Sequence, residues 1–193
     1  MGQAVLRTTV SEPEYLAFER AATDRHEYAD GEIFSMAGGT WEHSLVASNV
    51  QRELGSALRA LRCVAHGSDM RIHIPSTGRY TYADALVVCG QPVFTDEVRD
   101  TLVNPIVIVE VLSDSTEKYD RGDKFEQYQT IASLRDYLLV SQKKARIEHF
   151  SRQEDGTWVL RTSGAGERIA LASIGCEVEV DLAYAKVFEA GAG

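Results

Sequence analysis

Apolar residues recur at two different periods along the chain, and each period predicts one kind of element. From Trp41 to about Leu61 they return every three or four positions, which is the spacing of an amphipathic helix, and Thr40 before them is a favoured N-cap. Ser11 and Glu14 have the spacing of a capping box and predict a shorter helix. The first third of the chain is therefore expected to form two helices.

Short runs of β-branched and aromatic residues, bounded by turn residues, predict strands over most of the remaining chain. Asp30-Gly31 and Asp155-Gly156 are hairpin signals. The predicted strands are residues 64–74, 80–89, 106–109, 136–140, 146–150, 157–161 and 169–180, with a hairpin over residues 25–36 and a short terminal helix over residues 182–189. We expect an α/β (or α+β) fold, in which helices flank one mixed central sheet and a hairpin extends it near the C-terminus.

Composition narrows the class of protein. The length of 193 residues suggests a single domain over residues 1–193, and 44% hydrophobic with 25% charged residues is typical of a soluble globular chain. No apolar run approaches the ~20 residues that span a bilayer, so we expect no membrane partner. The net charge of −9 counts against a broad surface for phosphate backbones, although a nucleic acid could still bind through a metal ion and a local basic rim.

The cysteines and the N-terminal segment suggest a compartment. Cys63, Cys89 and Cys176 are odd in number and far apart, so we interpret them as reduced thiols. The N-terminal residues lack the apolar core of a signal peptide. Both observations favour a cytoplasmic protein.

Two acidic residues stand at the ends of apolar strand runs. Residues 106–109 predict a strand buried on both faces, and Glu110 follows where the apolar run should continue. Burial of an ionised carboxylate is costly unless a metal, a base or several hydrogen-bond donors meet it. Asp84 precedes the apolar run 85–89 in a similar way, and a predicted helix carrying Lys124 follows Glu110.

If the two strands are neighbours, Asp84 and Glu110 come within a few ångströms of each other. Such a pair repels unless a cation lies between them, and it forms a natural half-site for Mg²⁺. Glu32 in the early hairpin could supply a third oxygen, and Lys124 could favour a metal-activated hydroxide and offset charge on a phosphate. The alternative is structural: Asp84 caps a turn, Glu110 pairs with Arg121, and Lys124 is solvated. We favour the metal site because one hypothesis explains the whole set.

The order Asp84, Glu110 and then a lysine is similar to that of the PD-(D/E)XK nuclease superfamily. Over about residues 12–188 the chain more closely resembles the Uma-type family of bacterial restriction-endonuclease-like proteins. The matching segments are HEYADGEIFSMAGGTWEHS, GSDMRI, YTYADALVV, NPIVIVEVLSDSTEKYDRGDKFEQY, DYLLV and IEHFSRQEDGTW. The resemblance implies a restriction-endonuclease-like fold with its core over these residues.

Carried over by position, Asp84 matches the motif aspartate, Glu110 the motif acid and Glu32 an acid found ahead of the core. Two positions depart from the motif: Ala83 replaces a proline and Leu112 replaces the lysine. The resemblance therefore implies that the catalytic lysine has migrated to the helix as Lys124. Asp69 and Ser113 also lie in matching segments, Asp69 as a further site candidate and Ser113 as a residue that stabilises the loop after the strand. Outside the motif, His43 in the first turn of the long helix could reach a substrate phosphate, but we favour a capping or packing role for it.

The resemblance implies a nuclease that uses Mg²⁺ (or Mn²⁺) to hydrolyse phosphodiester bonds, with DNA as the favoured substrate. Asp84, Glu110 and Glu32 would hold the metal and Lys124 would stabilise the attacking hydroxide. A homodimer would suit a duplex with two strands to cut. Two alternatives stay open: a non-catalytic binding or scaffold domain that keeps the fold, and a metal-dependent hydrolase acting on RNA or nucleotides.

Overall fold

The computed structural model describes residues 5–36 and 38–188, in which the strands form two six-stranded sheets and one two-stranded sheet. The first sheet has the order β1-β3-β2-β6-β5-β8 and contains β1 (Val5–Arg7), β2 (His26–Ala29), β3 (Glu32–Ser35), β5 (Arg71–Ile74), β6 (Arg79–Tyr82) and β8 (Thr101–Leu102). The second has the order β12-β11-β10-β9-β7-β4 and contains β4 (Cys63–Gly67), β7 (Ala85–Cys89), β9 (Val107–Leu112), β10 (Asp136–Ser141), β11 (Arg146–Arg152) and β12 (Trp158–Gly164). Strands β13 (Arg168–Leu171) and β14 (Cys176–Glu179) pair with each other.

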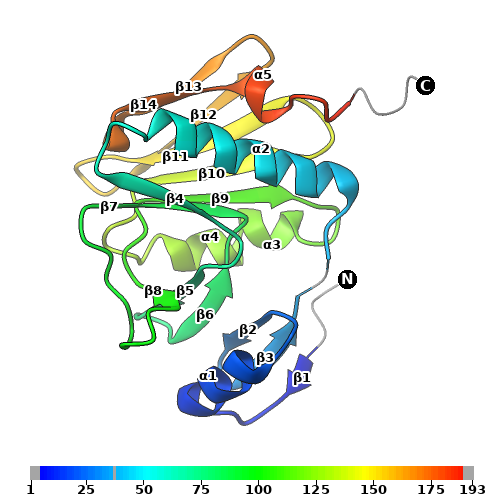
Figure 1. Cartoon of the computed structure of the whole chain (residues 1–193), viewed down its shortest axis with the longest axis vertical. Coiled ribbons are helices and arrows are strands. Elements are labelled where there is room, and N and C mark those ends of the chain that lie inside the picture. Colours follow the sequence, from blue (N-terminus) through cyan, green and yellow to red (C-terminus); the bar gives the residue numbers. More distant parts are fainter. Residues whose placement is uncertain (1–4, 37, 189–193) are drawn as a thin grey trace.

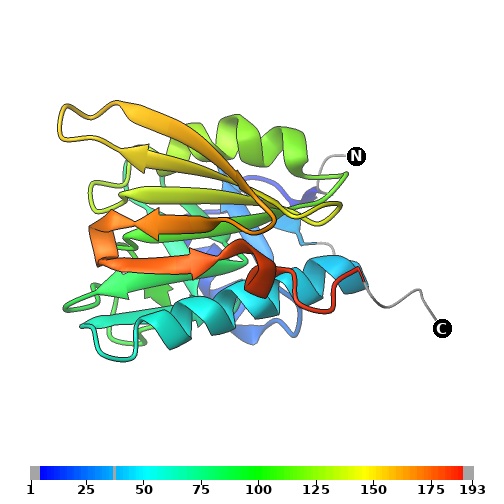
Figure 2. The same cartoon turned by 90° about the horizontal axis from the view of Figure 1, so that it is seen from above.

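The helices are α1 (Glu12–Ala21), α2 (Trp41–Ala57), α3 (Glu117–Arg121), α4 (Asp123–Tyr128), α5 (Val180–Ala183) and the 3₁₀ helix η1 (Ala172–Ile174). Helix α1 packs on the first sheet, whereas α2 and the pair α3 and α4 cover the two faces of the second sheet. Helix α2 buries Val46, Val50 and Leu54 against one face, as its sequence period predicts. Helix α4 packs Phe125 and Tyr128 on the other. Figure 2 shows the second sheet between the cyan helix α2 and the yellow-green helices α3 and α4.

Alternation along β9 decides which of its side chains face each layer. Val107, Val109 and Val111 belong to the core beneath α2, whereas Ile108 and Leu112 belong to the core beneath α4. Glu110 lies between Ile108 and Leu112 in this alternation, so its carboxylate is on the α4 side. The burial on both faces that the sequence predicts for this strand is confirmed.

The α/β class with flanking helices is confirmed, but the strands divide between two mixed sheets where one was expected. Two predicted strands cross from one sheet to the other. Segment 64–74 breaks at a turn into β4 and β5, and segment 80–89 breaks at Ala83 and Asp84 into β6 and β7. Figure 1 shows the first sheet, with α1 and the β2–β3 hairpin, below the second sheet. The two crossings occur where the sheets meet.

Three smaller expectations need correction. The helix after Glu110 is interrupted at Gly122, which gives α3 and α4. The terminal helix is α5, which begins before the predicted segment 182–189 and ends within it at Ala183. The last residue of that prediction, Glu189, lies outside the described residues. None of the helices in residues 5–36 and 38–188 has the length and apolarity to cross a membrane.

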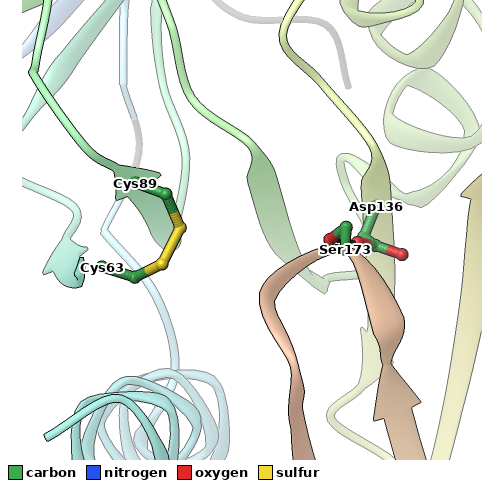
Figure 3. The surroundings of a disulfide bond; sticks show 4 residues. All are labelled: Cys63, Cys89, Asp136 and Ser173. Carbon is green, nitrogen blue, oxygen red and sulfur yellow. Dashed lines mark hydrogen bonds between the residues drawn. A yellow bond between two sulfur atoms is a disulfide. The ribbon is translucent and has the colours of Figure 1, made fainter. Parts of the chain in front are cut away.

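The prediction of reduced thiols is wrong for two of the three cysteines. Cys63 and Cys89 are directly opposite each other on the antiparallel strands β4 and β7, and they form a disulfide (Figure 3). Cys176 is free. The pairing depends on the register of two strands whose cysteines are 26 residues apart, which composition does not reveal. Figure 3 also shows Ser173 of η1 beside Asp136 of β10, to which its hydroxyl donates a hydrogen bond.

Candidate active site

A cavity of about 800 Å³ lies where the two sheets meet. The first sheet contributes residues of β2, β3 and β6 to its lining, and the second contributes the end of β9. The start of α2 and the loop into α3 complete the wall. Its lining includes five acidic residues together with a histidine, an arginine and a lysine: Glu27, Asp84, Glu110, Asp114, Asp120, His43, Arg79 and Lys124.

Strand register brings Asp84 and Glu110 together. In the antiparallel pair of β7 and β9, Ala85 is opposite Val109. The same register, continued by one residue, places Asp84 opposite Glu110. The Asp84 carboxylate accepts a hydrogen bond of 2.7 Å from the backbone N–H of Val111. The sequence prediction that these strands are neighbours is confirmed.

Lys124 points into the same corner as Glu110. Its Nζ is 2.8 Å from Glu110 Oε1 and donates a hydrogen bond of 3.2 Å to the carbonyl of Tyr82. Glu110 is 4% exposed and Lys124 is 6% exposed. The hydroxyl of Tyr128, one turn further along α4, donates to the same carboxylate oxygen at 2.9 Å. The helix after β9 therefore delivers both an ammonium and a hydroxyl to the buried acid.

Two more acids surround the ammonium. Glu27 Oε1 lies 3.6 Å and Asp120 Oδ1 lies 3.8 Å from Lys124 Nζ. Glu27 is 1% exposed and its Oε1 accepts a hydrogen bond from Thr81, whereas its Oε2 has no hydrogen-bond partner among the residues that the structure describes. A buried carboxylate oxygen without a donor is unfavourable unless something absent from the chain itself meets it.

Burial and crowding shift the protonation of this corner. The pKa of Glu110 is raised well above its usual value by burial and by Asp120 and Asp84, which together outweigh Lys124. Burial also raises the pKa of Asp120. Burial lowers the pKa of Lys124, but Glu110 and the other nearby acids outweigh it, so the net shift is upward and the ammonium keeps its proton.

His43 joins the corner from the first turn of α2. Its Nε2 lies 3.4 Å from Asp84 Oδ2, and hydrogen bonding to this carboxylate raises the pKa of the imidazole. The backbone N–H of His43 donates a hydrogen bond to the Oγ1 of Thr40, the predicted N-cap. His43 therefore has both a capping contact through its backbone and a site contact through its ring.

Glu32 does not line the cavity, whereas Glu27 on the partner strand of the same hairpin does. Glu27 pairs with Phe34, and both line the cavity. Glu32 pairs with Ala29, two residues further along the strand and next to the turn. The two glutamates share one face of the hairpin, so alternation alone did not distinguish them.

The other candidates have separate roles. Asp69 points away, with a side chain 99% exposed and an ion pair to Arg25. Ser113 lines the cavity, and its hydroxyl accepts a hydrogen bond from the backbone N–H of Thr116, which fits the predicted stabilisation of the loop. The structural alternative paired Glu110 with an arginine such as Arg121, but Arg121 pairs with Glu117 and Glu148, and the cationic partner of Glu110 is Lys124.

The donor chemistry of the corner fits a hard cation. Within the described part of the chain, no three His, Cys, Asp or Glu side chains are already gathered in a metal-binding cluster. Asp84 and Glu110 nevertheless offer carboxylate oxygens, and Mg²⁺ commonly takes one or two carboxylates and completes its shell with water. Glu27, Glu110 and Asp120 around Lys124 exceed its single positive charge, and Glu27 Oε2 has no hydrogen-bond partner among the described residues. An oxygen-liganded divalent ion would offset this excess.

Comparisons with known proteins find a matching family and similar chains. The sequence profile of a family named Uma2, described as "Putative restriction endonuclease", matches residues 12–183. The uncharacterized Synechocystis protein slr1290 is 37% identical over 175 residues, which cover 91% of each chain. A second Synechocystis protein, sll1609, is 37% identical over 147 residues, 76% of this chain and 83% of the relative.

A solved structure shares the fold. It is described as a putative nuclease belonging to DUF820 from Anabaena variabilis, and it superposes with a TM-score of 0.74 over 92% of this chain and 99% of its own. The sequence identity is 13%, so this likeness concerns the arrangement of the elements.

Proposed function

Because this chain belongs to the Uma2 family, whose description supports nuclease activity in general, we propose that it is a metal-dependent nuclease that hydrolyses phosphodiester bonds in DNA. The observation that carries the proposal is the convergence of Asp84, Glu110 and Lys124 on one buried corner of a large cavity. A scaffold that merely kept the fold would have no need for an excess of buried acids around a lysine.

Asp84 and Glu110 would hold Mg²⁺ or Mn²⁺. Glu27 would be the third metal ligand, the role that was predicted from the sequence for Glu32. When bound, such an ion supplies Lewis-acid chemistry: it activates water and offsets negative charge on a phosphate. The unpartnered Oε2 of Glu27 supports its assignment as the third oxygen donor. Tyr128 holds the Glu110 carboxylate in place through its hydrogen bond.

Lys124 would stabilise charge that develops on the attacking oxygen or on the phosphate. An ammonium has three N–H donors, and Glu110 and the Tyr82 carbonyl occupy two of them. The third N–H remains for a substrate or water oxygen. Because the ammonium is buried and remains protonated, its field acts in a poorly screened environment, where preorganised donors contribute most to catalysis.

The test is cleavage by purified protein of supercoiled plasmid, single-stranded DNA and RNA, with Mg²⁺, with Mn²⁺ or with EDTA. We expect metal-dependent nicking of the plasmid that is lost in Asp84→Ala and Glu110→Ala. Lys124→Ala should keep metal affinity but lose most of the rate, since an ammonium is not a ligand.

Matched controls are Glu97→Ala and Lys118→Ala, which remove single charges from exposed side chains outside the cavity. Both should cut like the parent. Equal cleavage by the parent and by all three site variants would refute the assignment. Cleavage of RNA alone would favour the RNA hydrolase alternative.

A further inference from the structure

Arg79, the first residue of β6, lines the cavity without an acidic partner. Among the described residues, no carboxylate oxygen lies within salt-bridge distance of its guanidinium, although five acids line the same cavity. Arg71 and Arg146, which are also at most partly exposed, pair with Asp100 and Glu148. Arg152 has no acidic partner among the described residues either, but it donates to the Ile131 carbonyl and lies over the Trp158 ring, and it does not line the cavity. The charge of Arg79 is therefore not used by the neighbouring acids.

Tyr119 of α3 holds this guanidinium from the side. Arg79 Nη1 donates a hydrogen bond to the Tyr119 hydroxyl, and the guanidinium carbon lies 5.6 Å from the centre of the Tyr119 ring. Both residues line the cavity. A guanidinium has five N–H donors in a planar fork, so most of them remain available to an acceptor in the cavity. A phosphate suits such a fork because it accepts two parallel hydrogen bonds.

The position of Arg79 on β6 places it away from the acidic corner. Arg79 and Thr81 share one face of the strand because side chains alternate, and the Thr81 hydroxyl contacts Glu27. Two residue rises separate them, which is about 7 Å along the strand. This offset is comparable to the spacing of successive phosphates in a nucleic-acid chain, so Arg79 can reach a phosphate beside the one at the acids.

We propose that Arg79, oriented by Tyr119, binds the backbone phosphate next to the scissile phosphodiester. This inference rests on the proposed nuclease function and adds to it a residue that positions the substrate. An acidic cavity repels a polyanion, and the guanidinium of Arg79, two residues along β6 from Thr81, would offset this repulsion locally. With a net charge of −9 the chain offers no broad basic surface, so a local cationic contact of this kind favours the approach of a phosphate backbone.

Binding measured against salt concentration tests this contact directly. Fluorescence anisotropy of a labelled single-stranded oligodeoxynucleotide, and of a labelled hairpin duplex, is recorded with Ca²⁺ in place of Mg²⁺. Each phosphate contact contributes about 0.7 (single strand) or 0.9 (duplex) to the slope of log affinity against log salt. Arg79→Ala should lower that slope by this amount and weaken binding by about tenfold or more.

Two variants distinguish the contribution of the planar guanidinium and its orientation from that of its positive charge. Arg79→Lys keeps a cation, so it should restore the salt slope but not the full affinity. Tyr119→Phe removes the orienting hydroxyl, so it should weaken binding at an unchanged slope. The control is Arg161→Ala, which removes an exposed arginine of β12 that does not line the cavity and should match the parent. Urea unfolding of each variant establishes that it is folded.

The outcomes distinguish this inference from the proposed function. If the parent binds and cuts DNA while Arg79→Ala has the slope and affinity of Arg161→Ala, Arg79 does not contact a phosphate and only this inference fails. If Arg79→Ala does not fold and Arg79→Lys loses the slope as well, the residue is structural and the inference is overturned. If the parent binds no oligonucleotide, both proposals fail together.

Discussion

Lys124→Met should destabilise the protein, because it leaves buried acids without their ammonium. The Lys124–Glu110 pair has an N–O distance of 2.8 Å, and both side chains are less than a tenth exposed. At an effective dielectric constant of about 20, the pair attracts by about 6 kcal/mol. The cost of dehydrating the ammonium offsets part of this attraction. Removal of one member of a buried pair costs about 3–5 kcal/mol, and we expect a loss in this range at about pH 8.

The loss should depend on pH in a defined direction. The pKa of Glu110 is raised by burial, and Lys124 is the charge that opposes the shift. A carboxyl group whose pKa is higher in the folded state stabilises the fold below its unfolded pKa, and this contribution disappears as the pH rises through the folded pKa. Without Lys124 the folded pKa rises further. The deficit of Lys124→Met should therefore be small near pH 5 and largest near pH 8.

Urea unfolding at the two pH values measures the effect. With an m value of about 2–3 kcal/mol per molar urea, a loss of about 3–5 kcal/mol lowers the midpoint by about 1–2.5 M. Lys118→Met is the matched control, since Lys118 is an exposed lysine of α3 and should change the midpoint little. A midpoint equal to that of the parent at pH 8, or a deficit that is the same at both pH values, would refute the ion-pair account.

Four further variants probe the site and the disulfide. Asp84→Asn keeps an acceptor for the Val111 N–H but removes a charge, so the melting temperature with EDTA should rise by about 2–4 °C. Cleavage and the rise in melting temperature caused by Mg²⁺ should be lost. A lower melting temperature would make Asp84 a structural residue. Glu27→Gln should abolish cleavage while Glu32→Gln retains it, and the reverse pattern would restore the original assignment. Cys63→Ser should cost about 3.5 kcal/mol in urea unfolding from the entropy of a loop of 26 residues, and an unchanged midpoint under oxidising conditions would contradict the disulfide.

Asp84, Glu110 and Lys124 could be predicted as site candidates because each stands out in a local sequence pattern. Asp84 and Glu110 each interrupt an apolar strand, and a charge at such a position is conspicuous because burial is expensive. Lys124 lies on a helix that returns directly after β9, so chain direction alone brings it near Glu110. Asp120 was also within reach, because it precedes Lys124 by four residues and so lies on the same helix face.

Residues that depend on the meeting of the two sheets were harder to find. The choice between Glu27 and Glu32 requires knowing how the β2–β3 hairpin docks against β6 and β9, and both glutamates satisfy the same alternation. The second sheet itself was missed because segments 64–74 and 80–89 read as continuous strands. They pass from one sheet to the other through residues 68–70 and 83–84, which contain neither glycine nor proline.

The residues of the site are far apart along the chain, so the site can form only after most of them have been synthesised. A growing polypeptide that has reached Glu110 already carries Glu27 and Asp84, yet the ammonium that balances them has not been added. Even after Lys124 is made, β9 lacks its parallel neighbour β10 until Ser141 has left the ribosome. Translation must therefore pass Ser141 before the proposed metal site can be complete.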